Sequence, residues 1–303
     1  MSADVVISKK HWIWIAFVVV SCLVFYRTIG ALVQYSLQED SSSYALIIPL
    51  IAFFLIFLEK NKIFAAVRPN SAGGIALALL GLLLFVLAKR MSPQEPGTWS
   101  FSFQIIAILV VWAGGFLFCY GFAALRAAAF PLLFLLFAVP LPTVILDRII
   151  YALQVGSTEI TYLIFQAVGT PVVREGFLLS VPGVTIEVAK ECSSIRSSIA
   201  LLITCLLAAH LYLRTTWKIA LFVLLAMAVS VVKNGIRIAT LTLLSVHVDP
   251  GFLTGRLHRQ GGFVFYLIAL AILYPILVLL QKSEPNSRHS VDGKLAPTFS
   301  PES

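Results

Sequence analysis

Charged side chains are scarce in this sequence. Asp, Glu, Lys and Arg make up 12% of its 303 residues, whereas 59% of the residues are hydrophobic. A soluble domain of this size needs many more charged groups on its surface and has shorter apolar segments. The scarcity of charge therefore excludes a soluble globular protein and indicates a chain that crosses a membrane several times.

Several motifs that carry chemistry in other proteins are absent. The sequence has no internal repeat, no glycine-rich phosphate loop and no cluster of Cys and His with metal-ligand spacing. We therefore expect neither a metal nor a cofactor. The net charge of +8 does not indicate a nucleic-acid partner, because basic loops are the ordinary topology signal of a membrane protein.

Cysteine is also rare, and the positions of the four thiols are more informative than their number. Cys22, Cys119 and Cys205 lie within apolar runs, where a thiol normally acts as a small inert hydrophobic group. Cys192 alone lies at a predicted membrane boundary. It is separated from Cys205 by roughly 20 Å along one predicted helix, which excludes a disulfide between them.

Eight apolar segments predict about eight transmembrane helices and an all-α polytopic membrane fold. The first segment is too long for the apolar part of a signal peptide and lacks a clear cleavage site, so we expect it to be retained. The fifth is short and bounded by prolines, which predicts a kink or a partial crossing. The segments are, approximately, 12–32, 44–58, 73–88, 101–123, 127–142, 193–213, 217–246 and 262–280.

Two further segments differ from the apolar runs. Residues 143–167 carry polar side chains at helical spacing, which predicts an amphipathic helix that either lies on the membrane or packs against the bundle. Residues 176–188 predict a small β-hairpin with its turn at Pro182-Gly183, directly before the sixth apolar segment. We expect residues 1–281 to form a single membrane domain and residues 282–303 to be a disordered tail rich in Ser and Pro.

The topology follows from the even number of predicted spans, which places both termini on one side of the membrane. Lys9 and Lys10 precede the first span and the loop after it is acidic, and both features favour cytoplasmic termini. The basic pair Lys89-Arg90 favours the opposite orientation. With cytoplasmic termini, the boundary at Cys192 faces the outside and the hairpin is extracytoplasmic.

The stretch that begins with Glu191 and Cys192 stands directly before the sixth apolar segment. A thiol at the start of a helix experiences the partial positive charge of the helix N-terminus, which favours the thiolate. Arg196, one turn further on, adds a full positive charge on the same face. The pattern indicates that Cys192 is a nucleophile.

Helix lengths bring two more groups to the level of Cys192. From Lys218 to Arg237 the seventh segment covers roughly 28 Å, which places Arg237 near the face at which the sixth segment begins. His258 precedes the last segment, which starts back from that same face. A thiolate, a histidine that transfers a proton and an arginine that stabilises an oxyanion or orients the thiol together suit acyl transfer.

Each of these groups also has a purely structural interpretation. Arg237 is also explained as an arginine that snorkels at a helix end, and His258 as an ordinary loop histidine. Arg196 is either part of the site or the partner of a carboxylate such as Glu187. In this interpretation the polar residues around the thiol only cap a helix: Glu191, Ser193, Ser194 and Ser197.

The combination of these motifs resembles the exosortase/archaeosortase family of polytopic cysteine transpeptidases. Most of the chain takes part in the resemblance, although Ala45 and Ser194 replace a histidine and a glycine that many members have. The residues that carry it are Ser43-Tyr44 to Pro49, the proline-bounded helix at 130–142, Glu191 to Ser197, Asn234 to Ile238, and His258 with Gly262.

The resemblance implies an enzyme that cleaves a C-terminal sorting signal similar to PEP-CTERM from exported, membrane-anchored proteins. The protein would form a thioester with Cys192 and then pass to an amine-bearing acceptor on a membrane or surface. In this scheme His258 transfers the proton and Arg237 stabilises the oxyanion or orients the thiol, with Arg196, Asn234 and Glu191 as binding or supporting residues. The resemblance further implies a bacterial inner membrane, a site that faces the periplasm or exterior, and an association with exopolysaccharide production.

Three other functions remain compatible with the pattern. A transporter or flippase for an anionic lipid-linked substrate would use the outer arginines to bind the headgroup and would have no need of a thiol. An intramembrane serine protease would use Ser193 or Ser197 instead of Cys192. A non-catalytic scaffold for polysaccharide assembly would need none of the three proposed catalytic residues.

Overall fold

The computed structural model describes residues 3–93, 95–189, 195–253 and 256–284, and in several of these, including 256–261, only the backbone. The chain divides into two compact units, residues 1–150 and 151–303, with the boundary inside helix α9. Glu191 and Cys192 lie outside the described residues, as does nearly all of the predicted tail at 282–303. A single membrane domain over residues 1–281 stays a prediction.

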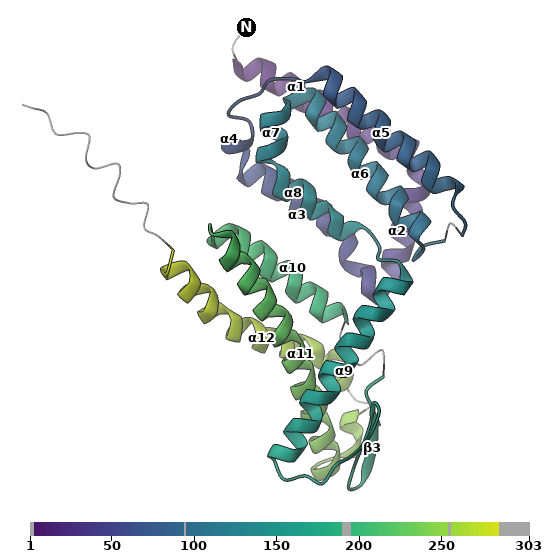
Figure 1. The fold of residues 1–303 in the computed structure, drawn as a ribbon, viewed down its shortest axis with the longest axis vertical. Coiled ribbons are helices and arrows are strands. Elements are labelled where there is room, and N and C mark those ends of the chain that lie inside the picture. Colours follow the sequence, from purple (N-terminus) through teal and green to yellow (C-terminus); the bar gives the residue numbers. More distant parts are fainter. Residues whose placement is uncertain (1–2, 94, 190–194, 254–255, 285–303) are drawn as a thin grey trace, which may run out of the picture. The chain divides into compact units, whose positions relative to one another are not determined.

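The first unit consists of helices (Figure 1). Their bounds are α1 Ala3–Val24, α2 Tyr26–Gln38, η1 Asp40–Leu46, α3 Ile48–Leu58, α4 Lys60–Ile63, α5 Ser71–Arg90, α6 Trp99–Tyr120, α7 Phe122–Ala127, α8 Ala129–Phe134, η2 Leu135–Ala138 and the start of α9, Thr143–Ala167.

Helices α5 and α6 pack closely because small residues line their interface. A Cβ atom added to Gly74 of α5 would lie 2.5 Å from the Cβ of Phe118, and one added to Gly114 of α6 would lie 2.6 Å from the backbone nitrogen of Ala78. Glycine at such positions lets two helix backbones approach, which is the usual basis of helix association in a membrane. Of the two, α6 is the more buried, and α5 lies at the outer edge of the first unit (Figure 1).

Two predicted spans of this unit are not formed by a single long helix. The segment 12–32 is broken at Phe25, where α1 and α2 meet at 81°, so it forms either a broken span or a re-entrant loop, and the first span stays a prediction. Helix α2 is the more polar part, and its buried Thr28 hydroxyl donates to Gln104 Oε1 of α6 at 3.2 Å. Helix α3 begins near Pro49 and has only 11 residues, too few for the full crossing predicted over 44–58.

The predicted kink in the fifth segment is confirmed. Residues 129–138 form α8 and η2, and the chain then turns by 90° into α9. Five helices of the described residues are long and apolar enough to cross a membrane, and each bent pair would add one more, which gives up to seven. The chain is therefore a multi-pass membrane protein, and the number of eight spans stays a prediction.

The second unit contains a three-stranded antiparallel sheet and three long helices. Beside the end of α9, its elements are β1 Val173–Glu175, β2 Leu178–Val181, β3 Val184–Glu187, α10 Ile195–Tyr212, α11 Thr216–His247, η4 Pro250–Leu253 and α12 Arg256–Lys282. The predicted hairpin is β2–β3, with Val181 opposite Val184 across a turn in which Gly183 has φ +93°. Strand β1 adds a third strand beside β2.

The sheet packs its apolar face on α9 and on the last part of α11. Leu179 and Ile186 of the sheet are buried in one cluster with Phe165 of α9 and Ala239 of α11. Because residues 238–247 of α11 are occupied by the sheet, this part of the long helix is used for packing against protein.

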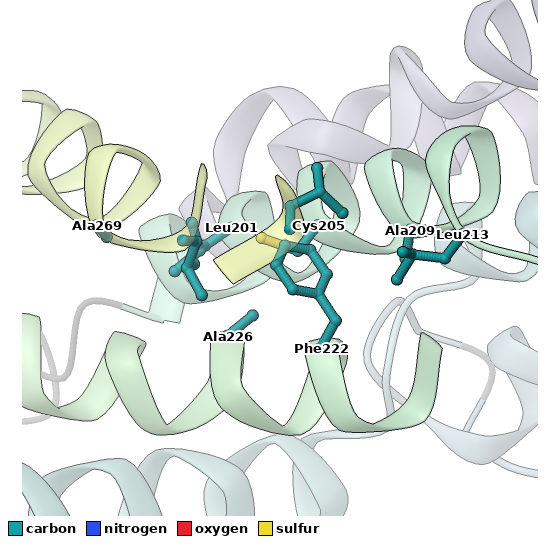
Figure 2. Close-up of a cluster of buried hydrophobic side chains, with 9 residues drawn as sticks. Leu201, Cys205, Ala209, Leu213, Phe222, Ala226 and Ala269 are labelled. Carbon is teal, nitrogen blue, oxygen red and sulfur yellow. The ribbon is translucent and has the colours of Figure 1, made fainter. Parts of the chain in front are cut away.

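The three long helices share a second apolar core. Figure 2 shows the sulfur of Cys205 among Leu201, Phe222 and Ala226. Cys205 is buried there, as expected for a thiol that serves only as a small hydrophobic group. Helices α10 and α12 run parallel, joined by a hydrogen bond of 2.9 Å between the hydroxyls of Thr204 and Tyr266, and α11 runs antiparallel to both.

A carboxylate that follows α12 caps the start of α11. Glu284 accepts hydrogen bonds from the backbone nitrogens of Arg214 and Thr215, both at 3.2 Å, and from the Thr215 hydroxyl at 2.7 Å. The ammonium of Lys218 lies 3.9 Å from it. The hydrogen bond from Thr215, followed by those from the backbone, lowers the pKa of Glu284 from its ordinary value.

This cap makes the stability of the protein depend on pH. A carboxyl group whose pKa is lowered by folding stabilises the folded state above its unfolded pKa, and the contribution disappears as the pH falls through the folded pKa. We expect Glu284→Gln to lower Tm by about 2 °C at pH 7 and to have a smaller effect at pH 3, measured by thermal unfolding in detergent. Glu187→Gln, at an exposed carboxylate of β3, is the matched control; a Glu284→Gln effect that is equal at both pH values would contradict the proposed cap.

Candidate functional site

A stripe of polar side chains runs along one face of α11. Ser230, Lys233, Asn234 and Arg237 follow one another at positions i, i+3, i+4 and i+7 of a helix that is long and apolar enough to span the membrane. Ser230, Lys233 and Asn234 are only 1%, 4% and 1% exposed. Buried polar and charged groups in such a helix lower its stability unless they are hydrogen-bonded, and they usually mark a functional site.

The first turn of α10 supplies two of the partners. The Lys233 ammonium donates a hydrogen bond of 2.6 Å to Ser197 Oγ, and the Ser230 hydroxyl donates one of 2.8 Å to Ser198 Oγ. Consecutive serines of α10 are thus tied to residues one turn apart on α11. The contact fixes the N-terminal end of α10, the helix that begins three residues after Cys192.

The side-chain amide of Asn234, the third residue of this stripe, forms its hydrogen bond with helix α9. Asn234 Nδ2 donates to Ser157 Oγ at 2.8 Å, and the Thr161 hydroxyl donates to the Gly235 carbonyl at 3.3 Å. Ser157 and Thr161 are fully buried. Of the two predicted interpretations of 143–167, packing against the bundle is therefore the one observed for the part of α9 in the second unit.

The backbones of α9 and α11 approach closely at this point. A Cβ added to Gly235 would lie 2.4 Å from Ile160 Cγ2 and 2.6 Å from Ile160 Cβ. The Cβ of Ile160 is bonded directly to its backbone, so a change of side-chain rotamer cannot relieve the overlap. Helix α9 would therefore have to move away from α11.

We expect Gly235→Ala to lower the free energy of unfolding by about 1–3 kcal/mol, because it overpacks this contact. Gly30→Ala is the matched control, since Gly30 lies in helix α2 with open space around its Cα; there the gain in helix propensity should leave stability unchanged or raise it by up to about 1 kcal/mol. Thermal unfolding of both variants in the same detergent measures the difference. A Gly235→Ala protein as stable as Gly30→Ala would show that α9 and α11 are not in close contact.

Arg237 lies one turn beyond Lys233, roughly 6 Å further along α11. Since Lys233 contacts Ser197, and α10 begins only two residues before Ser197, this step brings Arg237 level with the start of α10. Its side chain is half-buried and its Nε atom is buried. A guanidinium held at the start of α10 is placed to act on a group that enters at that helix end.

His258 is the third residue of α12, and its side chain is not described. The bond between Thr204 and Tyr266 fixes the register of the parallel helices α10 and α12. His258 and Arg196 both lie eight residues before that bond, roughly 12 Å along each axis. The backbone at His258 is thus level with the first turn of α10, where the side chain of Arg196 is exposed.

The chain ahead of α10 is anchored as well. The backbone nitrogen of Val188 donates to the Phe177 carbonyl at 3.0 Å, and the Val188 carbonyl accepts from Gln154 Nε2 of α9 at 2.9 Å. Val188 is buried. Glu191 and Cys192 stand between this anchor and the first turn of α10, in the part of the chain that lies outside the described residues.

Some members of this site were missed in the sequence. The role of Ser197 as partner of Lys233, and of Ser157 and Thr161 as partners of α11, was not predicted. The available signal was Lys233 itself, because an ionisable side chain inside an apolar helix normally has a specific polar partner. Within the described part of the chain, no three His, Cys, Asp or Glu side chains come together as ligands for a metal ion.

Comparison with known proteins agrees with these motifs. Residues 36–275 match a protein-family model described as transmembrane exosortase. The matched range covers most of the chain and contains Cys192, Arg237 and His258. No curated protein and no solved structure matches the chain.

Proposed function

Because the chain belongs to the transmembrane exosortase family, whose members are membrane cysteine transpeptidases with a role in protein sorting, we propose that it cleaves a C-terminal sorting signal through a thioester on Cys192. The substrates would be membrane-anchored exported proteins with a signal similar to PEP-CTERM. The cleaved protein would then pass to an amine-bearing acceptor on a membrane or surface. The enzyme would act in a bacterial inner membrane with its site facing outward.

The proposed chemistry has two acyl-transfer steps. The Cys192 thiolate attacks the carbonyl carbon of the scissile peptide bond, and the carbon–nitrogen bond breaks as the leaving amine takes a proton from His258. An acceptor amine then attacks the thioester, His258 takes the proton of that amine, and the thiolate leaves. Arg237 stabilises the oxyanion of both tetrahedral intermediates or orients the thiol.

The observation that supports this proposal best is the buried link between Lys233 and Ser197. It holds the first turn of α10 against the same face of α11 that carries Arg237. Cys192 is three residues from Ile195, and three residues of chain reach at most about 11 Å. The nucleophile that we propose is thus tethered to the helix end with which Arg237 is level.

Further residues support the site in this proposal. Arg196, in the first turn of α10, would bind a substrate carboxylate or favour the thiolate, and Glu191, next to Cys192 in the sequence, would bind the substrate or support the site. Asn234 would act indirectly, since its hydrogen bond with Ser157 keeps α9 against the helix that carries Arg237.

One observation favours a second candidate, a serine protease. A buried lysine in a hydrogen bond of 2.6 Å with a serine hydroxyl is also the arrangement in which a neutral lysine activates a serine nucleophile. In that enzyme Ser197 would attack the peptide bond and Cys192 would have no chemical role. This mechanism requires Lys233 to be neutral when Ser197 attacks.

Labelling of the purified protein distinguishes the two nucleophiles. We expect iodoacetamide to modify Cys192 and to stop the processing of a co-expressed tagged protein, whereas a fluorophosphonate has no effect. Ser197→Ala should keep part of the activity, because it removes a contact that positions α10 and not the nucleophile. Loss of all activity in Ser197→Ala, together with fluorophosphonate labelling of Ser197, would replace the cysteine mechanism with the serine mechanism.

A further inference from the structure

The first unit contains a cavity that the proposed reaction does not use. It has a volume of about 440 Å³ and lies among α1, α3, α4 and α6. This volume falls within the ~300–1,000 Å³ that is usual for small-molecule sites. All of its lining residues belong to the first unit, whereas Cys192, Arg237 and His258 belong to the second.

The cavity is apolar along most of its length. Trp14 and Ile15 of α1, Phe53 and Ile56 of α3, and Phe116 of α6 line this part, and they belong to apolar stretches of their helices. The aromatic packing around it is dense: the rings of Trp14 and Phe116 meet edge to face at a centroid distance of 5.6 Å. Such walls suit a hydrocarbon chain.

The other end of the cavity is polar. Lys60 and Asn61 are the first two residues of α4 and are both exposed, and the Lys60 ammonium lies 4.5 Å from the centroid of the Phe57 ring. His11, which also lines the cavity, forms a hydrogen bond of 2.8 Å between its Nδ1 and the Tyr120 hydroxyl. Hydrogen-bonding groups thus gather at the mouth of an apolar cavity, which is the arrangement that fits an amphiphile.

The charge at the mouth selects the headgroup. Among the described residues, Lys60 has no carboxylate within ion-pair distance, whereas the neighbouring Lys62 pairs with Glu59 at 3.4 Å. An ammonium at the end of a membrane helix attracts an anionic lipid headgroup and repels a basic peptide segment. The occupant therefore needs an acceptor-rich anionic head and an apolar tail.

We propose that this cavity is a binding site for an anionic phospholipid, with one acyl chain beside Trp14 and the phosphate near Lys60 and Asn61. The site is separate from the proposed peptidase chemistry and would exist whether or not Cys192 is a nucleophile. One lysine at a membrane surface contributes roughly a fivefold preference for an anionic over a zwitterionic lipid. The preference should depend on Lys60 and not on Lys62.

Tryptophan quenching by lipids brominated on the acyl chain tests the site. The full-length protein is placed in nanodiscs with a small fraction of brominated phosphatidylglycerol or brominated phosphatidylcholine. The fluorescence that Trp14→Phe removes reports on the site alone, because the other four tryptophans remain in both proteins. We expect half-maximal quenching of Trp14 at about fivefold less phosphatidylglycerol than phosphatidylcholine.

Two variants separate a headgroup site from a general lipid contact. Lys60→Gln should make the two lipids equal, and Lys62→Gln, the matched control at an exposed and ion-paired lysine, should keep the preference. Size-exclusion chromatography checks that both variants fold. Equal quenching by both lipids in the unmodified protein, no quenching of Trp14 at all, or a preference that survives Lys60→Gln would each overturn the proposal.

Discussion

Cys192→Ala is expected to reduce the processing of a tagged substrate by a factor of about 10³ or more, because it removes the nucleophile on which both acyl-transfer steps depend. The substitution only shortens one small side chain, so the amount of folded protein in the membrane should not change. Co-expression with candidate tagged proteins, followed by immunoblotting for the cleaved form, measures the effect.

The other cysteines provide the control for this experiment. Cys22→Ala removes a thiol from α1, in the first unit, and should leave processing unchanged. A Cys192→Ala protein that processes its substrate like the unmodified protein would contradict the transpeptidase. It would instead favour the transporter, in which the arginines bind an anionic headgroup and the thiol has no role.

Arg237→Gln is expected to lower the rate of processing by about 10²–10³, the usual cost of removing one group that stabilises an oxyanion. The glutamine keeps a hydrogen-bond donor of similar reach but loses the charge. Arg237→Lys keeps the charge and loses the planar fork of donors, so it should be intermediate. Rates are measured with the same tagged substrate after normalising for the amount of enzyme.

A surface arginine separates this effect from a general loss of charge. Arg174 of β1 forms an ion pair of 2.7 Å with Glu159 at the protein surface, and Arg174→Gln should keep full activity. Processing by Arg237→Gln within a factor of three of the unmodified protein would contradict a role of Arg237 in the reaction. In that case the simpler interpretation of Arg237 as a snorkelling residue would hold.

The elements that were correctly predicted are those with strong local signals. The hairpin β2–β3 was predicted because Pro182-Gly183 is a turn sequence between two alternating segments, and α11 because a long apolar run is interrupted by no proline. Strand β1 has only three residues and was missed, since its hydrogen bonds with β2 do not follow from its own sequence.

The features that were not predicted depend on partners far away in the sequence. The sequence of α9 did not indicate whether its polar face contacts water or protein. Ser157 of this face is buried because it forms a hydrogen bond with Asn234, which lies on another helix. On the opposite side of α9, the apolar Tyr151 and Leu163 are 58% and 55% exposed, which reverses the orientation expected of an amphipathic helix in water.

For the candidate site, the sequence predicted the level of residues along their helices but not the contacts between helices. Helix lengths were sufficient to place Arg237 and the backbone of His258 near the start of α10, because the rise per residue of a helix is constant. The contact between Lys233 and Ser197 was beyond such a calculation, since it depends on the rotation of α10 and α11 about their axes. The break at Phe25 was missed because no proline or glycine stands at that position; the polar residues Arg27 and Thr28, directly after it, were the available signal.

Mass spectrometry of the enzyme during turnover tests the proposed covalent step most directly. The protein is quenched in acid in the presence of a tagged substrate and digested, and the peptide that contains Cys192 is examined for the mass of the substrate fragment. We expect an adduct on Cys192 that hydroxylamine removes, as it does a thioester, and no adduct in Cys192→Ala. An adduct on Ser197, or substrate cleavage in Cys192→Ala, would show that Cys192 is not the nucleophile.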